Sequence, residues 1–221
     1  MKAMLLAAGR GERLRPLTNT TPKPMLIAGG QTLIEHQLAR LKNAGITDVV
    51  VNLHHLGDQI RTKLRDGAGM GMSIAYSVEP DLLETGGGIL HALPLLGRSP
   101  FVVVSADTYI DFDLGRLTGT LLGDCLGCLV MTRNPPHHED GDFSINADGL
   151  LANSTGKLTY TGTGLLAPAL VGNEKLRAFK LREVFDEAIH AGKLQGIFHD
   201  GYWCDVGTVE RLEDLRKYLA E

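Results

Sequence analysis

Short apolar runs alternate with amphipathic stretches through the first half of the chain. The run 2–8 ends at Gly9, and the runs 47–53, 72–78 and 101–104 have the β-branched, apolar composition of buried strands. Apolar residues at helical spacing predict helices from 33 to a stop at Gly45, over 58–64 and over 86–95. Thr32 and Glu35 have the spacing of a capping box at the start of the first helix. This alternation predicts an α/β fold with a mixed, mostly parallel central sheet and helices on both faces.

The pattern changes beyond residue 125, where strands are expected over 126–132, 142–145 and 157–166. An amphipathic helix follows over 178–191, and Thr208 is expected to cap a last helix. The segments 194–199 and 202–206 are interpreted as a hairpin. No linker or repeat divides the chain, so we expect one domain over residues 1–221 with two halves, 1–124 and 125–221.

Composition excludes several classes of protein. The chain has 221 residues and a net charge of −4, which argues against a non-specific nucleic-acid binder. No apolar stretch approaches ~18 residues and the N-terminal run is too short for a signal peptide, so neither a membrane partner nor secretion is expected. Three cysteines indicate reduced thiols in the cytoplasm. Cys125 and Cys128 form a C-x-x-C without a second pair, which disfavours a zinc ribbon.

The turn after the first strand combines glycines with positive charge. Gly9 and Gly11 let backbone N–H groups approach an anion, and the nearby cations are Arg10, Arg13, Arg15 and Lys23. A dinucleotide fingerprint fails because Leu14 stands at its third glycine, and no P-loop sequence occurs. A local basic site on an acidic protein suits a small polyanion such as a triphosphate.

Two further polar segments follow strands of the same sheet, 79–88 and 105–107. Ligands of parallel α/β sheets bind beyond the carboxyl ends of the strands. The glycine turn and these two segments are therefore expected to meet at one edge of the sheet.

The residues Leu6 to Pro24 match L-A-A-G-x-G-x-R-L-x-P-L-T-x-x-x-P-K-P, and 203–208 match W-x-D-x-G-T. The sequence thereby resembles the sugar-1-phosphate nucleotidyltransferases over essentially its whole length. The resemblance implies a Rossmann-like, glycosyltransferase-A-like fold without a C-terminal β-helix domain. It also implies attack of a sugar 1-phosphate on the α-phosphorus of a nucleoside triphosphate, with pyrophosphate leaving. Residues 1–124 would then bind the nucleotide and 125–221 the sugar phosphate.

The resemblance also assigns roles to residues of this sequence. Arg13 and Lys23 are implied as catalytic cations, and Mg²⁺ is implied on Asp107 and Asp205, which are 98 residues apart in the sequence. The implied nucleotide-binding residues are Ala8, Gly9, Gly11, Glu12, Arg13, Lys23, Glu79, Glu84, Thr85, Gly86 and Ala106. The implied sugar-phosphate-binding residues are Gly141, Asn153, Gly162 and Asp205. His137 and His138 are expected in a loop that lines the acceptor. The sequence 153–157 replaces the family's usual Glu-Lys-Pro, which leaves the second phosphate-binding cation unassigned.

Within the family, the short length and the segments 83–88 and 135–143 favour UTP and N-acetylmuramate 1-phosphate, a pair used in cell-wall recycling. The alternative is a mannose- or glucose-1-phosphate nucleotidyltransferase that uses GTP, UTP or dTTP. A catalytically silent sensor of nucleotide sugars is a remote alternative, because Arg13, Lys23, Asp107 and Asp205 are all present. A glycosyltransferase with a D-x-D motif at Asp111 and Asp113 would leave the first motif unexplained. A monomer or small homo-oligomer is expected.

Overall fold

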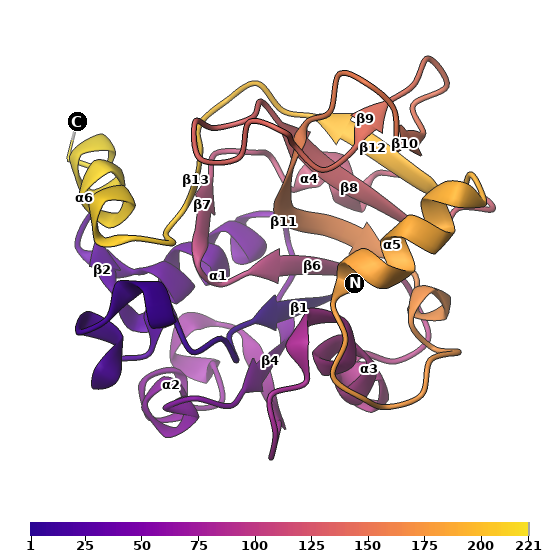
Figure 1. The fold of residues 1–221 in the computed structure, drawn as a ribbon. Helices are drawn as coiled ribbons and strands as arrows, with labels where there is room; N and C mark the ends of the chain where they lie inside the picture. The colour runs from indigo at the N-terminus through magenta and orange to yellow at the C-terminus, as the bar shows by residue number, and fades with distance from the viewer. Residues whose placement is uncertain (221) are drawn as a thin grey trace.

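A seven-stranded sheet passes through both halves of the chain in the computed structural model, which describes residues 1–220 (Figure 1). The strand order is β12-β8-β11-β6-β1-β4-β5. Four neighbouring pairs are parallel, and only β11 runs antiparallel to its two neighbours, β6 and β8. The strands are β1 (Lys2–Leu6), β4 (Asp48–Leu53), β5 (Ser73–Val78), β6 (Phe101–Ser105), β8 (Gly127–Thr132), β11 (Thr159–Leu166) and β12 (Leu194–Phe198).

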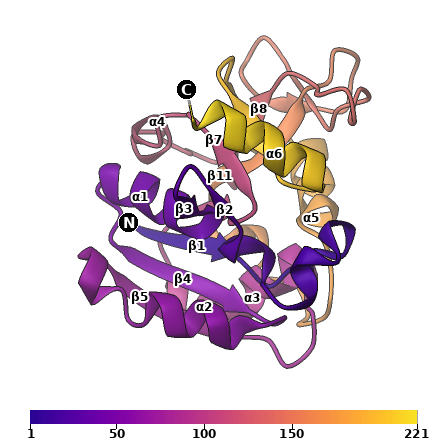
Figure 2. The ribbon, with the colours of Figure 1, turned by 90° about the vertical axis from the view of Figure 1, so that its left-hand side faces the viewer.

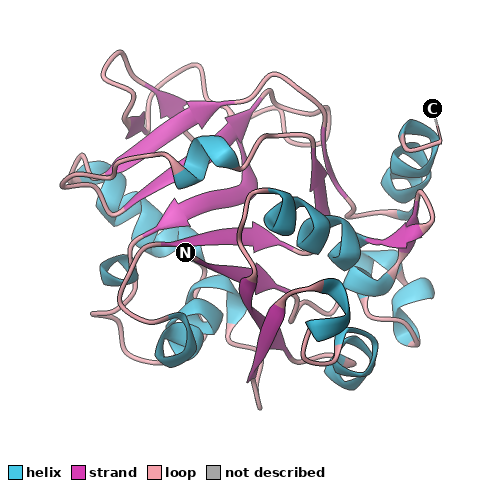
Figure 3. Ribbon diagram, turned by 180° about the vertical axis from the view of Figure 1, so that it is seen from behind, coloured by secondary structure: helices cyan, strands magenta, loops and turns pink. Residues whose placement is uncertain are grey.

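Helices cover both faces of this sheet (Figures 2 and 3). Successive residues of a strand point to opposite faces, so in β1 Ala3 and Leu5 join one core cluster while Met4 joins the other. The first cluster includes α1 (Leu33–Asn43), α2 (Gly57–Leu64) and α4 (Gly115–Thr118). The second includes α3 (Glu84–Leu96) and α5 (Leu181–His190). The mixed, mostly parallel sheet with helices on both faces is therefore confirmed.

Smaller elements surround the sheet. Three two-stranded ribbons are β2 (Ile27–Ala28) with β3 (Gln31–Thr32), β9 (Ser144–Ile145) with β10 (Leu151–Ala152), and β7 (Thr108–Ile110) with β13 (Trp203–Asp205). The helix α6 (Val209–Tyr218) packs on a third, smaller core that contains Leu14, Leu33 and Val206. Short 3-10 turns are η1 (Glu12–Leu14), η2 (Leu17–Asn19), η3 (Lys23–Met25), η4 (Ala68–Met70) and η5 (Pro168–Leu170).

The predicted hairpin over 194–206 is wrong. β12 pairs in parallel with β8 inside the main sheet, whereas β13 pairs antiparallel with β7 in a separate ribbon. Both segments have strand composition, but each satisfies its backbone with a partner that is distant in sequence. The expected strand at 142–145 is reduced to Ser144–Ile145, and the expected helix at 178 begins at Leu181.

Two further predictions concern what the chain lacks. Within residues 1–220 no β-helix domain is present, as expected. None of the helices in that range is long and apolar enough to cross a membrane.

Candidate active site

The ribbon formed by β7 and β13 brings Asp107 and Asp205 together. Asp205 is paired with Thr108 in the ribbon, and the backbone N–H of Val206 donates to the carbonyl of Asp107 at 2.9 Å. Thr108 follows Asp107 directly, so the chain returns after 98 residues to set the second aspartate beside the first. The family resemblance implied this proximity, although neither segment carries a local signal for it.

Two adjoining cavities lie at the carboxyl ends of β1 and β6. The smaller cavity, about 230 Å³, is lined by Ala8, Gly9, Lys23, Asn52 and Asp107 among others. The larger cavity, about 580 Å³, is lined by Arg13, His137, Gly162, Lys180 and Asp205 among others. Both cavities share Leu6, Glu84, Thr85 and Ser105. The two spaces therefore form one cleft with a narrow and a wide part.

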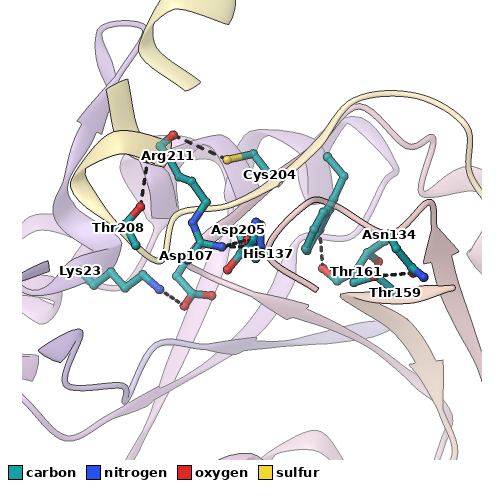
Figure 4. A network of polar contacts seen from close by, with 11 residues as sticks. Lys23, Asp107, Asn134, His137, Thr159, Thr161, Cys204, Asp205, Thr208 and Arg211 are labelled. Carbon is teal, nitrogen blue, oxygen red and sulfur yellow. Dashed lines mark hydrogen bonds and ion pairs between the residues drawn. The ribbon is translucent and has the colours of Figure 1, made fainter. Parts of the chain in front are cut away.

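Lys23 forms an ion pair with Asp107 at the smaller cavity (Figure 4). The Lys23 side chain is only 10% exposed, whereas that of Asp107 is 38% exposed. A nearly buried ammonium is stable only when it is paired, so Asp107 compensates Lys23 in this structure. The structure thus joins a predicted catalytic cation to a predicted metal ligand.

Asp205 is held by two groups at the larger cavity. Its Oδ1 atom lies 2.6 Å from Nη1 of Arg211 and 2.9 Å from Nε2 of His137 (Figure 4). His137 belongs to the loop after β8, and Arg211 belongs to α6. Sequence reasoning missed Arg211.

A buried polar network lies behind the wall of the smaller cavity. Asn52 accepts a hydrogen bond from the Ala7 N–H at 2.7 Å and donates to Oε1 of Glu79 at 2.7 Å. Glu79 is 2% exposed, and its Oε2 accepts from the Leu83 N–H at 3.0 Å. Glu79 thus lies behind the cavity wall, while Asn52 lines it. The signal that sequence reasoning missed was a polar residue inside the apolar strand 47–53.

The glycines of α3 allow close packing. A Cβ atom at Gly87 would lie 2.2 Å from the backbone oxygen of Arg177, and one at Gly86 would lie 2.3 Å from the ring of Phe179. Gly86 therefore faces the segment before α5 and lines neither cavity. The same contact brings in α5, whose Leu181 N–H donates to Oγ1 of Thr85 at 2.9 Å.

Glu84 occupies the wall that the two cavities share and has an unusual backbone. Its φ angle is +60°, a left-handed conformation that non-glycine residues rarely adopt. Its side chain forms no hydrogen bond or ion pair within residues 1–220. Strained residues of this kind cluster at ligand sites.

The outer wall of the larger cavity is a set of charged and aromatic side chains. Asp142 accepts from the Tyr160 N–H at 2.8 Å and lies 3.4 Å from Arg182, whose guanidinium covers the ring of Phe143 at 4.2 Å. Burial, with the nearby charge of Asp142, raises the pKa of Tyr160. Lys180 lines this cavity and forms no ion pair in the described part of the chain.

Gly162 also lines the larger cavity, as the resemblance implies. Its φ angle is +78°, and a Cβ atom there would lie 2.6 Å from Oγ of Ser105. Only glycine fits at this approach of β11 to the end of β6.

The remaining predicted residues lie outside both cavities. Glu12 is exposed, within 4.0 Å of Arg10 and 3.9 Å of Arg15, and Gly11 packs on Thr18. Ala106 is fully buried.

Two predicted sugar-side residues are also away from the cleft. Gly141 packs against Asn134. Asn153 lines a separate shallow hollow together with Lys157. The structure therefore does not bring Gly141 or Asn153 to the larger cavity.

The D-x-D alternative has no place in the cleft. Asp111 lies 2.6 Å from Nε2 of His199, and Asp113 accepts from the Gly115 N–H at the start of α4. Neither aspartate lines the two cavities.

The three cysteines are free thiols, and burial raises the pKa of Cys128 to about 11.

Asp107 and Asp205 form a donor set that fits Mg²⁺. Magnesium takes one or two carboxylates and completes its shell with water and substrate phosphates, and both side chains line the cleft. Within residues 1–220 no group of three or more His, Cys, Asp or Glu side chains could form a closed metal cage. An open two-carboxylate site is the kind that a phosphate substrate completes.

Comparisons with known proteins identify the class that this fold and cleft define. Residues 2–120, more than half of the chain, match the family described as nucleotidyl transferase. The chain belongs to that family, and the prediction of a sugar-1-phosphate nucleotidyltransferase is confirmed.

Particular relatives narrow the comparison. The chain is 47% identical to the N-acetylmuramate alpha-1-phosphate uridylyltransferase of Neisseria meningitidis, over 98% of this chain and 97% of that protein. It is 34% identical to the protein of the same name from Caulobacter vibrioides, over 99% and 97%. A mannose-1-phosphate guanyltransferase of Aspergillus oryzae is 29% identical, and the match covers 94% of this chain and 61% of that protein.

Solved structures agree on the fold. A Bacillus anthracis protein described as a glucose-1-phosphate thymidylyltransferase, in complex with sucrose, gives a TM-score of 0.88 at 21% identity, covering 100% of this chain and 96% of that chain. HddC from Yersinia pseudotuberculosis, complexed with GMP-PN, gives 0.84 at 20% identity, covering 98% of each chain. At this identity the likeness concerns the fold alone.

Proposed function

We propose that this protein transfers the uridylyl group of UTP to N-acetylmuramate α-1-phosphate, which yields UDP-N-acetylmuramate and pyrophosphate. The observation that carries the proposal is the pairing of β7 with β13, which sets Asp107 and Asp205 on one cleft beside Lys23. The two relatives named as uridylyltransferases, matched over nearly their full length, support the choice of substrates.

The smaller cavity suits the nucleotide. Gly9 follows β1, and a Cβ atom added to it would meet nothing within 4 Å, so its backbone is open to an anion. We assign Lys23 to the α-phosphate and Arg13 to the leaving phosphates. Nucleotidyl transfer depends on positioning and charge neutralisation, and these two side chains supply both.

Asp107 and Asp205 would hold Mg²⁺. When bound, the ion would neutralise charge that develops on the reacting oxygens. Asp107 forms an ion pair with Lys23 in this structure, and the same carboxylate would bind the metal when Lys23 turns to the α-phosphate.

The larger cavity suits an acceptor with two anionic groups. N-acetylmuramate 1-phosphate carries a phosphate and a carboxylate, and besides Arg13, which we assign to the leaving phosphates, this cavity presents His137, His138 and Lys180. Lys180 forms no ion pair within residues 1–220; its charge acts on the carboxylate of Glu183, and its side chain lines the cavity, where it can bind an anionic ligand. We assign it to the acceptor, in place of the lysine that the family usually carries in a Glu-Lys-Pro stretch.

We place the enzyme in the cytoplasm as a monomer or small homo-oligomer. Its cysteines are all free, which suits a reducing compartment. The second candidate function is guanylyl or uridylyl transfer to mannose or glucose 1-phosphate, which the match to mannose-1-phosphate guanyltransferases favours.

The test is pyrophosphate release with Mg²⁺ over a grid of substrates. UTP, dTTP, GTP, ATP and CTP are each combined with the 1-phosphates of N-acetylmuramate, N-acetylglucosamine, glucose and mannose. Turnover confined to UTP with N-acetylmuramate 1-phosphate is the expected result. Preference for a neutral sugar or for GTP would transfer the assignment to the second candidate, and no turnover in any combination would contradict both.

A further inference from the structure

Arg211 contacts two residues of the larger cavity from behind. Its Nη1 atom lies 2.6 Å from Oδ1 of Asp205 and 2.5 Å from Nε2 of His137 (Figure 4). The Arg211 side chain is only 14% exposed and lines neither cavity. Arg211 can therefore act on a substrate only through the groups that it holds.

Arg211 lies in the first turn of α6, where a positive charge is disfavoured by the helix dipole. Thr208 caps α6 by accepting from the Arg211 N–H at 3.3 Å, which makes Arg211 the third residue of the helix. Side chains in helices lean toward the N-terminus, so a long side chain at this position points back toward Asp205. A cation in the first turn is unfavourable to the helix dipole. The ion pair with Asp205 offsets that cost.

Gly207 makes room for the guanidinium group. A Cβ atom at Gly207 would lie 2.0 Å from Nη2 of Arg211, and the backbone there has no positive φ that would itself require glycine. The glycine of the W-x-D-x-G-T motif is thus explained by the arginine that follows it four residues later.

The contacts on Asp205 are one-sided. Oδ1 accepts from Arg211 and lies 2.9 Å from Nε2 of His137, whereas Oδ2 receives no hydrogen bond from residues 1–220. We propose that Arg211 is a positioning residue, which fixes Oδ1 of Asp205 and leaves Oδ2 free, so that this oxygen would be available to hold a metal ion. This inference rests on the proposed function, because it takes Asp205 as a metal ligand. The positive charge of Arg211 also repels a metal ion, so orientation is gained at the expense of affinity.

The central experiment compares turnover with metal binding in Arg211→Ala. We expect kcat to fall about 10- to 100-fold, the range that a misplaced catalytic group produces, with little change in KM for UTP. Mn²⁺ binding without substrates, followed by electron paramagnetic resonance, should not weaken, because a repelling charge is removed. Added guanidinium ion should restore part of kcat, since the variant leaves space where the side chain lay.

Two variants separate positioning from folding. Arg216 lies on the same helix, where it donates to the Ile27 carbonyl and pairs with Glu213, so Arg216→Ala should lower stability but leave kcat within twofold. Gly207→Ala should slow turnover in the wild-type background, because its methyl group would displace the guanidinium and lie 3.1 Å from Oδ2 of Asp205.

The outcomes that overturn the inference are specific. Unchanged kcat in Arg211→Ala, or loss of kcat and Mn²⁺ affinity together with a lowered Tm, would contradict positioning. A loss confined to KM for the acceptor would mean that Arg211 reaches the substrate. If the wild type shows no turnover, the proposed function fails, and positioning then stands only if Arg211→Ala gives a Mn²⁺ signal with altered coordination at undiminished affinity; an identical signal would overturn it.

Discussion

At the residue scale, Asp107 has two roles: it forms an ion pair with Lys23, and it lines the smaller cavity. Asp107→Asn removes the charge that a metal needs while the shape of the side chain is kept. We expect kcat to fall roughly 10²–10³-fold, as for the loss of a preorganised charge. Tm should also fall, because the nearly buried Lys23 loses its anion. Steady-state kinetics and thermal melts measure the two effects.

A matched control is Asp113→Asn, which changes an exposed aspartate that accepts from the Gly115 N–H at the start of α4. Its kcat should equal that of the wild type. Near-normal turnover in Asp107→Asn would remove this residue from the reaction.

Glu84 has a strained, left-handed backbone at the cleft. The left-handed conformation of a non-glycine residue costs roughly 1–2 kcal/mol, and glycine would relieve it at the price of a more flexible unfolded chain. Glu84→Gly is therefore expected to be at least as stable as the wild type. Its kcat/KM should nevertheless fall roughly 10- to 100-fold, because a carboxylate that accepts hydrogen bonds from substrate hydroxyls contributes about 1.5–3 kcal/mol.

Thermal melts and kcat/KM, measured on the same preparation, test this trade-off. Glu84→Ala is the companion variant, since it loses the carboxylate but keeps the strained backbone. It should turn over more slowly than the wild type and be less stable than Glu84→Gly. Equal kcat/KM in Glu84→Gly and the wild type would show that the carboxylate does not meet substrate.

At the scale of elements, the start of α1 gives a prediction that depends on pH. Glu35 accepts from the Thr32 N–H at 2.9 Å and from its hydroxyl at 2.7 Å, and it pairs with Lys63 at 3.0 Å. Burial raises the pKa of Glu35, but the bonds from Thr32 and Lys63 outweigh burial and hold it below its usual value of 4.5. A lowered pKa in the folded state means that the charged carboxylate contributes stability above pH 4.5, and that this contribution is lost as pH falls through the folded value.

Glu35→Gln should accordingly be less stable than the wild type by about 1 kcal/mol at neutral pH. The difference should shrink as pH falls below 4.5 and the wild-type carboxylate is protonated. Urea unfolding at a series of pH values measures it. A difference that stays constant down to pH 3 would show that the charge of Glu35 does not contribute.

The elements that sequence reasoning predicted well are those whose signals are local. The capping box of Thr32 and Glu35 is present with both of its hydrogen bonds, and the run 101–104 is the central strand β6. The hairpin at 194–206 failed because strand composition does not name a partner, and β7, the partner of β13, has only three residues.

The same reasoning applies to the cleft. Lys23, Asp107 and Asp205 belong to fixed motifs and were predicted in sequence, and the structure brings them to adjoining cavities. Asn52 contacts Glu79, which is 27 residues further along the chain, and Arg211 contacts Asp205, which is 6 residues earlier. No motif indicates either contact. Their assignment required the geometry.

For the whole molecule, the sheet predicts that the two halves unfold together. β6 of the first half is bonded to β11 of the second, and one core cluster contains Met4, Ile89, Leu129 and Phe185. Trp203 is the only tryptophan; its Nε1 donates to the Thr161 carbonyl at 3.0 Å and its strand pairs with β7 of the first half, so its fluorescence reports on the contact between the two halves. Urea curves from Trp203 fluorescence and from far-ultraviolet circular dichroism should coincide.

A fluorescence midpoint at lower urea than the dichroism midpoint would show two units that unfold separately. Each half would then need a core of its own. Removal of the fluorophore provides the control: Trp203→Phe should abolish the fluorescence change without altering the dichroism midpoint by more than a few tenths of a molar.

The ribbon of β7 and β13 also sets the order in which the enzyme can come into being. A nascent chain that has reached residue 200 already contains the glycine turn, Lys23 and Asp107, but it has no Asp205 to place beside them. Closure of a loop of about 100 residues is entropically expensive and slow, so the carboxylate pair forms late, after the central strands have associated. Translation that stops before residue 205 therefore yields a chain that has Lys23 and Asp107 but lacks the second carboxylate of the proposed metal site.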